Sequence, residues 1–367
     1  MIDALSAKNI LEKDLENIFS CTSTSLNKLS GNEILITGGG GFLGYELIHA
    51  ILKIGDGDGR IKPKITVYEN FQRGAKPWLI ELATTKKINL VEHDINNPIP
   101  ETAPKFSYIV HAASIASPIY YRLFPIETID ANINGIRNIL NYSKNNANQG
   151  QVKGILYFST SEIYGDPTPD AIPTPETYRG LVSCTGPRAC YDESKRVGET
   201  LCVNFARQHG INVSIARPFN NYGPGLDIND RRLLPDLARN IFDNKDVSVL
   251  SNGSATRTFC YISDAISGYL KVLTHGERGE SYNIGTESPE ISVNDFTLKV
   301  LNIAKLHFNY DGSINYQTSD DVNYLVDNPN RRCPDISKAK QFLGYQPQIN
   351  LDEGLLNSLI WYRDNLK

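Results

Sequence analysis

Tyr191 and Lys195 form the residue pair whose chemistry is easiest to recognise in this chain. They are four positions apart in a segment, Tyr191–His209, that predicts a helix, so both side chains lie on one face. A free tyrosine titrates near ~10 and is a poor base at neutral pH. A neighbouring ammonium, or the positive ring of an oxidised nicotinamide, favours the phenolate and lowers that pKa. The pair is therefore suited to removing a proton from an alcohol while hydride leaves the same carbon.

Polar side chains end the predicted strand that precedes this helix, Gly154–Ser159. A hydroxyl at Thr160 can hydrogen-bond the oxygen from which Tyr191 removes a proton, and Glu162 is a second candidate acid or base. Serines and threonines at strand ends are often only turn formers. Their expected place at the edge of a sheet, beside the helix of Tyr191, is what favours a catalytic role.

A glycine-rich turn joins a predicted strand, Glu33–Thr37, to a predicted helix, Phe42–Ile54. Gly38 permits the tight turn, Gly41 lets the backbone touch a pyrophosphate, and Gly44 lets the helix lie close to the sheet. The free N–H groups and the dipole of the helix then hold the phosphates. A purely structural turn looks similar, but the flanking strand and helix favour a dinucleotide site.

The loop after the second predicted strand supports the same interpretation. Glu69 can accept hydrogen bonds from ribose hydroxyls, and its charge repels the extra phosphate of NADP, so NAD is favoured. A solvated loop carboxylate is the alternative. Asp94, after the third predicted strand, can contact the adenine. The other positions expected to line the cofactor, besides Tyr191 and Lys195, are Phe42, Leu43, Asn70, Ile95, Ala112 and Ala113.

Strands alternate with helices from Glu33 to Arg217, which predicts an α/β fold: a Rossmann-type doubly wound parallel sheet covered by helices on both faces. The ligands of such a sheet lie beyond the carboxyl ends of its strands. After Arg217 the pattern becomes irregular and predicts a smaller, mixed α/β substrate domain. The remaining predicted strands are Lys64–Tyr68, Ile88–Glu92, Tyr108–His111 and Asn212–Ala216, and the remaining helix is Ile126–Asn145.

Composition excludes several classes of function. The formal net charge of −4 argues against a nucleic-acid partner, which calls for a basic surplus. No apolar run is long enough to cross a bilayer, and no signal peptide is recognisable, so we expect a cytoplasmic protein without a membrane partner. The six cysteines include no Cys-x-x-Cys pair, so we expect reduced thiols and no metal site.

Three stretches carry a resemblance to a known family: Ser159–Pro167, Gly186–Arg196 and Thr256–Asp264. Through them, residues 33–346 resemble the extended short-chain dehydrogenases that act on nucleotide-sugars. The most similar subgroup is UDP-glucuronate decarboxylase, also called UDP-xylose synthase. The resemblance implies an NAD-dependent lyase that oxidises the sugar at carbon 4, releases carbon dioxide and reduces the ketone again.

The resemblance also implies residue roles. Thr160, Tyr191 and Lys195 match the catalytic trio, and Glu162 matches an additional acid/base glutamate. Ser161, implied to contact substrate, stands where sugar 4,6-dehydratases carry an aspartate that protonates the departing hydroxyl, so dehydration is disfavoured. The other residues implied to contact the substrate are Asn220, Arg257 and Arg332 at the nucleotide diphosphate, and Tyr121 and Arg232 at the sugar carboxylate, where Arg232 is counted with the catalytic residues.

We divide the chain accordingly. Residues 1–30 form a helical extension, with apolar residues at helical spacing up to Phe19 and a loop at Cys21–Ser25. Residues 31–217 form the NAD-binding domain, with a return segment at about 258–282. Residues 218–257 and 283–367 form the nucleotide-sugar-binding domain. The resemblance further implies a homodimer that pairs through the predicted helices Ile126–Asn145 and Tyr191–His209.

Four positions depart from the decarboxylase pattern. Gly225 replaces an arginine, Glu127 and Asp130 replace lysines, and Ile119 replaces a proline. Two acids in place of two lysines disfavour a carboxylate, so a different nucleotide-sugar remains an alternative substrate. The alternative activities are a nucleotide-sugar 4-epimerase or 4,6-dehydratase and, in a different class, a non-catalytic NAD-binding sensor.

Overall fold

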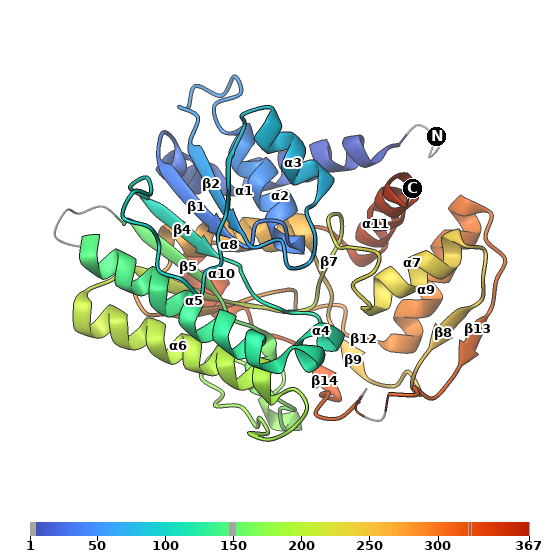
Figure 1. Ribbon diagram of the computed structural model, residues 1–367. Helices are drawn as coiled ribbons and strands as arrows, with labels where there is room; N and C mark the ends of the chain where they lie inside the picture. The colour runs from blue at the N-terminus through green and yellow to red at the C-terminus, as the bar shows by residue number, and fades with distance from the viewer. Residues whose placement is uncertain (1–4, 147–151, 322, 324, 367) are drawn as a thin grey trace.

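A seven-stranded parallel sheet forms the centre of the molecule (Figure 1). The computed structural model describes residues 5–146, 152–321, 323 and 325–366. The strand order is β11-β6-β5-β4-β1-β2-β3, which confirms the predicted Rossmann-type doubly wound sheet. The strands are β1 (Glu33–Thr37), β2 (Lys64–Glu69), β3 (Asn89–Glu92), β4 (Tyr108–His111), β5 (Gly154–Phe158), β6 (Val213–Pro218) and β11 (Ser281–Ile284).

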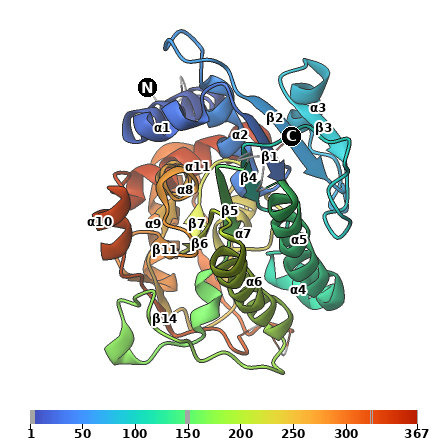
Figure 2. The ribbon, with the colours of Figure 1, turned by 90° about the vertical axis from the view of Figure 1, so that its left-hand side faces the viewer.

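Helices cover both faces of the sheet. Successive side chains of a strand point to opposite faces: Ile34 and Ile36 of β1 belong to one core and Leu35 to the other. The first core holds α1 (Ala7–Leu29), α2 (Phe42–Lys53) and α8 (Ile262–His275), and the second holds α5 (Pro125–Asn146) and α6 (Ala189–His209). Figures 1 and 2 both show α5 and α6 side by side. The fold therefore buries both faces, as its continuous apolar strands require.

The strand order reverses between β1 and β4, and this reversal places the candidate site. Both β2 and β4 pair with β1, one on each side. In open parallel sheets the ligand crevice lies at such a point, outside the carboxyl ends of the strands. The glycine-rich turn follows β1, Ala112 follows β4 and Thr160 follows β5 closely. One edge of the sheet thus carries the segments that were predicted to bind the cofactor and to catalyse.

The N-terminal extension is one long helix, α1, packed on α8, α2 and α11 (Leu351–Asn365). A capping box at Ser6 begins it. The predicted loop at Cys21–Ser25 is wrong: only Thr22 leaves helical geometry, with φ −128° and ψ 20°, and the helix continues to Leu29. Buried contacts of Leu26 and Leu29 with the first core outweigh the local turn preference of the serines and threonines. Residues 1–4 of the predicted extension lie outside the described residues.

A smaller mixed unit follows β6 and lies to one side of the sheet (Figure 1). It contains α7 (Leu233–Phe242), α9 (Val293–Phe308), α11 and three short sheets. The chain returns to the main sheet through α8 and β11. The short strands are β7 (Asn221–Tyr222), β8 (Val247–Val249), β9 (Thr256–Arg257), β10 (Cys260–Tyr261), β12 (Ile291–Ser292), β13 (Ile314–Tyr316) and β14 (Arg331–Arg332); the remaining helices are α3 (Pro77–Thr84), α4 (Pro118–Leu123), α10 (Ser337–Leu343) and the 3₁₀ turns η3 (Ser161–Tyr164) and η4 (Pro169–Ala171).

The described residues contain neither a candidate membrane span nor a candidate metal-binding cluster. Within residues 5–146, 152–321, 323 and 325–366, no helix combines the length and apolar character that a bilayer crossing needs. Over the same ranges, no group of three or more His, Cys, Asp or Glu side chains is arranged to hold a metal ion.

Candidate active site

Two glycines of the glycine-rich turn leave no room for a side chain. Gly38 has φ +68°, and a Cβ there would lie 2.5 Å from the Cα of Ala113. A Cβ on Gly44 would lie 2.1 Å from the carbonyl oxygen of Gly39. Gly41 is the N-cap of α2 and gives its first turn no side-chain cap. The turn is therefore a bare backbone cradle at a helix N-terminus, which suits a pyrophosphate.

Carboxylates after β2 and β3 lie along the same edge. An oxygen of Glu69 accepts a hydrogen bond of 3.0 Å from the backbone N–H of Gly40, so the side chain lies against the turn. Asn70 and Asp94 cap their own loops by accepting hydrogen bonds from backbone N–H groups two residues on. Ile95 is buried in the second core. The position of Glu69 beside the turn suits the ribose contact predicted for it.

Tyr191 lies in the first turn of α6 and is buried, as are Thr160 and Lys195. Burial raises the pKa of Tyr191 to about 12, against the lowering effects of a hydrogen bond with Thr160 and the charge of Arg232. The Nζ of Lys195 lies 5.8 Å from the ring centroid of Tyr191 and donates a 2.8 Å hydrogen bond to the carbonyl of Phe158. Burial lowers the pKa of Lys195 to about 7. Within the chain, desolvation therefore outweighs the expected lowering of the tyrosine pKa by the lysine.

Two further predicted residues lie beside this phenol. The ring of Tyr121, from α4, stacks on Tyr191 with centroids 5.1 Å apart and an interplanar angle of 9°. The Tyr121 hydroxyl is buried and has no hydrogen-bond partner in the described chain. Arg232 is the N-cap of α7, and its Nε lies 3.0 Å from an oxygen of Asp230. The arrangement brings together Tyr121, Tyr191 and Arg232, which come from three different helices.

Glu162 is held by two arginines. Arg332, from β14, donates from both terminal nitrogens to the two carboxylate oxygens, and Arg188, the N-cap of α6, contacts one of them. Burial raises the pKa of Glu162, but the guanidinium charges of Arg188 and Arg332 outweigh it and lower that pKa to about 2. In this arrangement Glu162 is a carboxylate at neutral pH. It can accept a hydrogen bond, but it has no proton to donate, and a carboxylate with so low a pKa is a weak base.

Arg188 was not among the predicted site residues. It precedes Tyr191 by three positions and lies inside the stretch Gly186–Arg196 that carried the family resemblance. An arginine at a helix N-terminus opposes the helix dipole, which is a local sign that its charge serves another purpose. Its side chain is only 8% exposed.

The residues expected at the nucleotide diphosphate also converge. Arg257 in β9 is register partner to Arg332 in β14, and Asn220 donates a 2.9 Å hydrogen bond to the carbonyl of Thr258. Arg257 gives its donors to backbone carbonyls, including that of Asn330 at 3.1 Å. Burial, and then the charge of Arg332, lower the pKa of Arg257 to about 9. Ser161, in η3, is buried beside Glu162.

Two of the departures from the family pattern have a structural reason. Gly225 has φ +87°, and a Cβ there would lie 2.8 Å from the Cβ of Tyr45, so an arginine does not fit this backbone. Glu127 is exposed in the first turn of α5, where a negative charge stabilises the helix dipole. Asp130 is half-buried in the next turn, and Ile119 lies in α4.

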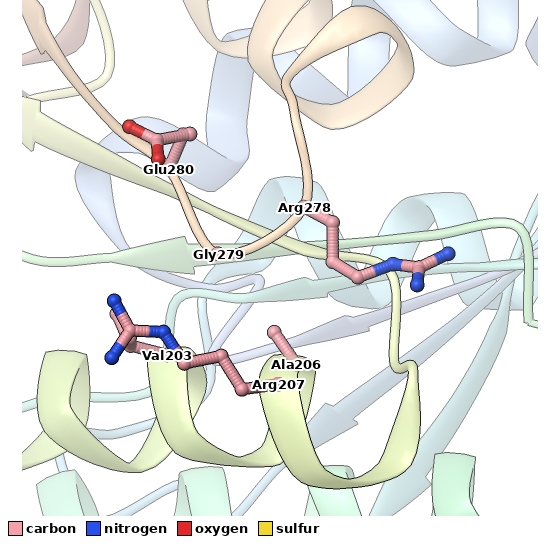
Figure 3. Close-up of a pocket in the computed structure, with 6 residues that line it drawn as sticks. All are labelled: Val203, Ala206, Arg207, Arg278, Gly279 and Glu280. Carbon is pink, nitrogen blue, oxygen red and sulfur yellow. The ribbon is translucent and has the colours of Figure 1, made fainter.

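A separate pocket of about 270 Å³ lies between α6 and the loop that precedes β11. Figure 3 shows the guanidinium groups of Arg207 and Arg278, which line it, pointing away from each other. They do not converge on one anion. The loop Gly276–Glu280 also leads into the amino end of β11, whereas ligands of parallel sheets bind beyond the carboxyl ends. This pocket is therefore not part of the candidate site.

Comparison with known proteins identifies the family. A sequence profile described as the NAD dependent epimerase/dehydratase family matches residues 34–285. The chain is 36% identical over 323 residues to UDP-glucuronic acid decarboxylase 3 of Arabidopsis thaliana, covering 88% of this chain and 86% of that protein. It is 34% identical over 342 residues to UDP-glucuronic acid decarboxylase 1 of Xenopus tropicalis, covering 93% and 75%.

Solved structures agree on the fold. UDP-glucose 4-epimerase of Thermotoga maritima, solved with UDP-glucose, aligns with a TM-score of 0.77 at 23% identity, covering 91% of this chain and all of that one. UDP-glucuronic acid 4-epimerase of Bacillus cereus, in complex with UDP-glucuronic acid and NAD, aligns with a TM-score of 0.72 at 22% identity, covering 90% and 99%. This chain belongs to the NAD dependent epimerase/dehydratase family, and NAD is its cofactor.

Proposed function

We propose that this protein is a UDP-glucuronate decarboxylase that forms UDP-xylose. The observation that carries the proposal is the likeness to UDP-glucuronic acid decarboxylases over 88% of the chain at 36% identity. The site supports it because Ser161, which has no acidic proton, stands beside Glu162 where a dehydratase needs a carboxylic acid. The arginine Arg232, near the stacked Tyr121 and Tyr191, suits a carboxylate-bearing sugar.

The chemistry uses the side chains of the site, the cofactor and water. Bound NAD supplies the redox step by taking hydride from carbon 4 of the sugar and returning it at the end. Tyr191, hydrogen-bonded with Thr160, takes the proton of the carbon 4 hydroxyl. The ketone so formed is β to the carboxylate. The bond to that carboxylate then breaks, carbon dioxide leaves, and the electron pair passes into the ketone as an enolate. Water protonates carbon 5, and the Tyr191 proton returns to the carbon 4 oxygen as the ketone is reduced, which completes a pentose.

Each group of side chains has a proposed part in this sequence. Arg232 and Tyr121 orient the sugar carboxylate, because a guanidinium binds a carboxylate through two parallel hydrogen bonds. Ser161 and Thr160 stabilise the oxyanion that develops on the ketone oxygen. Asn220, Arg257 and Arg332 hold the diphosphate, and Lys195 contacts the cofactor beside Tyr191. Glu162, a carboxylate in this site, orders a water near carbon 5 by accepting a hydrogen bond from it.

The test is to incubate the purified enzyme, with NAD, with UDP-glucuronate. Carbon dioxide and UDP-xylose are the expected products, identified by mass spectrometry. If the enzyme is saturated with NAD and neither product forms, UDP-glucuronate is not the substrate. A panel of other nucleotide-sugars then identifies the sugar that is accepted.

A 4-epimerase is the second candidate, favoured by the fold-level likeness to the UDP-glucose and UDP-glucuronic acid 4-epimerases. Epimerisation shares the carbon 4 oxidation and leaves the mass of the nucleotide-sugar unchanged, whereas decarboxylation removes carbon dioxide and dehydration removes water. Mass spectrometry therefore separates the three outcomes. A non-catalytic NAD-binding sensor would show none of them, and Tyr191→Phe would then change no measurable property.

We also propose that the enzyme is a cytoplasmic homodimer that pairs through α5 and α6. The two helices lie side by side over one face of the sheet. Exposed apolar side chains lie at and near the start of α5, with Leu123 and Ile126 each 64% exposed, and Val197 of α6 is 40% exposed. Light scattering is expected to give twice the monomer mass, and Ile126→Glu is expected to reduce it to that of the monomer.

A further inference from the structure

Glu162 is held from two sides by arginines that belong to different parts of the fold. Arg332 lies on β14, a two-residue strand of the smaller unit, next to Arg257 of β9. Arg188 is the N-cap of α6, the same helix that carries Tyr191 in its first turn. The first arginine therefore depends on the position of the smaller unit, and the second is fixed relative to the catalytic tyrosine.

The surroundings of Arg188 hold it in place. Its Nε lies 3.6 Å from an oxygen of Asp192, one helical turn further along α6, and its guanidinium carbon lies 5.9 Å from the ring centroid of Tyr121. The side chains of Arg188 and Asp192 are only 8% and 5% exposed. The second oxygen of Asp192 and the Nε of Arg188 have no hydrogen-bond partner within the described chain. Arg188 is thus a buried cation between two carboxyl groups, Glu162 and Asp192.

We propose that Arg188 is a positioning residue that keeps Glu162 ionised and aimed at the sugar when Arg332 turns to the substrate diphosphate, and that Asp192 holds Arg188 for this task. The proposal deepens the proposed function and rests on it. Nothing in the family resemblance assigned a role to either residue. It explains why a carboxylate that already has a bidentate partner is contacted by a second guanidinium.

The charges around Glu162 support these separate roles for Arg188 and Arg332. The groups facing Glu162 are Arg188 and Asp192 from α6, Arg257 from β9 and Arg332 from β14, with Tyr121 and Tyr191 beside them. A bound diphosphate would compete with Glu162 for the donors of Arg332. Without a second cation, burial would then raise the Glu162 pKa and protonate it. Since Arg257 is proposed to hold the same diphosphate, Arg188 is the cation that remains for Glu162.

Asp192 adds a dependence on pH. Burial, and then the charge of Glu162, raise the pKa of Asp192 to about 7, although Arg188 lowers it. Below this pH Asp192 is neutral and the charge of Arg188 acts on Glu162 alone. Above it, Asp192 shares that charge. We therefore expect Asp192→Asn to remove an inflection near neutral pH from the profile of kcat, while leaving the acid limb that belongs to Glu162.

The kinetic test compares Arg188→Gln and Arg188→Lys with wild type on the substrate that wild type accepts. Removing the charge in Arg188→Gln is expected to lower kcat by about 10²-fold with little change in KM. The acid limb of the kcat profile of Arg188→Gln should move to higher pH, because Glu162 is protonated more easily in that variant. Arg188→Lys keeps the charge. Its acid limb should return most of the way to the wild-type pH, whereas its kcat should recover only in part. Arg207→Gln, at an exposed position of the same helix, is the matched control. It should change neither kcat nor the pH of the acid limb.

A second measurement does not depend on the substrate. Infrared difference spectra between wild type and Glu162→Gln report the carboxylate stretch of Glu162 as the pH is lowered. With the diphosphate of UDP bound, this carboxylate should persist to lower pH in wild type and Arg188→Lys than in Arg188→Gln. If it titrates alike in all three proteins, and circular dichroism shows them folded, the proposal is wrong. Failure of wild type to release carbon dioxide would instead reject only the proposed substrate.

Discussion

Glu162 and Arg332 are 170 positions apart in the sequence, yet their side chains form a two-fold ion pair in the candidate site. Glu162 follows β5 of the main sheet, and Arg332 comes from β14 of the smaller unit. The pair therefore exists only when the two parts of the fold are packed together. Because Glu162 is held as a carboxylate of low pKa, its proposed part in catalysis is that of a hydrogen-bond acceptor.

Glu162→Gln tests this role. The amide keeps an acceptor for Arg332 but lacks the charge that orders the water at carbon 5, so formation of UDP-xylose should fall by about 10²-fold or more. Oxidation at carbon 4 relies on Tyr191 and should continue, so reduced cofactor should accumulate in single-turnover absorbance traces. Glu193→Gln, which removes a carboxylate paired with Arg196 on the α6 surface, should behave like wild type. Formation of UDP-xylose by Glu162→Gln at the wild-type rate would rule out the assigned role.

Tyr191→Phe should stop the reaction at the oxidation of carbon 4, before the step that Glu162→Gln affects. The variant lacks the phenolic oxygen that shares a hydrogen bond with Thr160, so no base is placed at the carbon 4 hydroxyl. We expect a loss of about 10³-fold in kcat, with no reduced cofactor accumulating. Tyr316→Phe removes the hydroxyl of a 56% exposed tyrosine and serves as the control. Retention of bound NAD by both variants would show that the cofactor site is intact.

Local patterns predicted the sheet and its glycine-rich turn because these depend on neighbours in the sequence. Gly38, Gly41 and Gly44 lie in one turn, and the alternation of strands and helices sets the order of the sheet. The Cys21–Ser25 segment was misjudged for the opposite reason. Its serines and threonines favour a turn locally, but contacts with α8 and α2, distant in sequence, keep it helical.

The electrostatics of the site could not be read from spacing. Four positions separate Tyr191 and Lys195, which predicts their shared face but not how deeply both are buried. Burial decides the pKa of each within the chain. The contact of Arg188 with Glu162 joins two segments that only the packing of η3 against α6 brings together. Charge pairs of this kind are a property of the tertiary structure.

Gly44→Ala tests the cofactor cradle. The new Cβ would lie 2.1 Å from the carbonyl oxygen of Gly39, and backbone atoms cannot yield as a side chain can. We expect loss of bound NAD and a lower melting temperature, corresponding to about 2 kcal/mol or more. Gly57→Ala is the control, since its φ of +81° is also unfavourable for alanine but nothing lies within 4 Å of the added carbon. That variant should lose about 1 kcal/mol and retain NAD.

Asp14 of α1 and Glu46 of α2 predict how stability depends on pH. Asp14 is 1% exposed, and the fully buried Glu46 lies within hydrogen-bonding reach of it. Burial raises the pKa of Asp14 from 3.8 to about 7 and raises that of Glu46 well above its ordinary value. The folded protein thus binds protons that the unfolded chain has released. The contribution of this pair to the free energy of unfolding should therefore be highest below about pH 4. It should fall as the pH rises to about 7.

Glu46→Gln separates this effect from other titrations. The glutamine amide can donate permanently to Asp14, replacing the proton that the pair otherwise has to share. At pH 8 we expect the variant to be more stable than wild type by about 1–3 kcal/mol in urea unfolding, a difference that shrinks as the pH is lowered. Glu12→Gln changes a 57% exposed carboxylate on α1, the helix of Asp14, and should shift stability by less than about 0.5 kcal/mol. Equal pH profiles for wild type and Glu46→Gln would mean that the two carboxyl groups do not share a proton when α1 is docked.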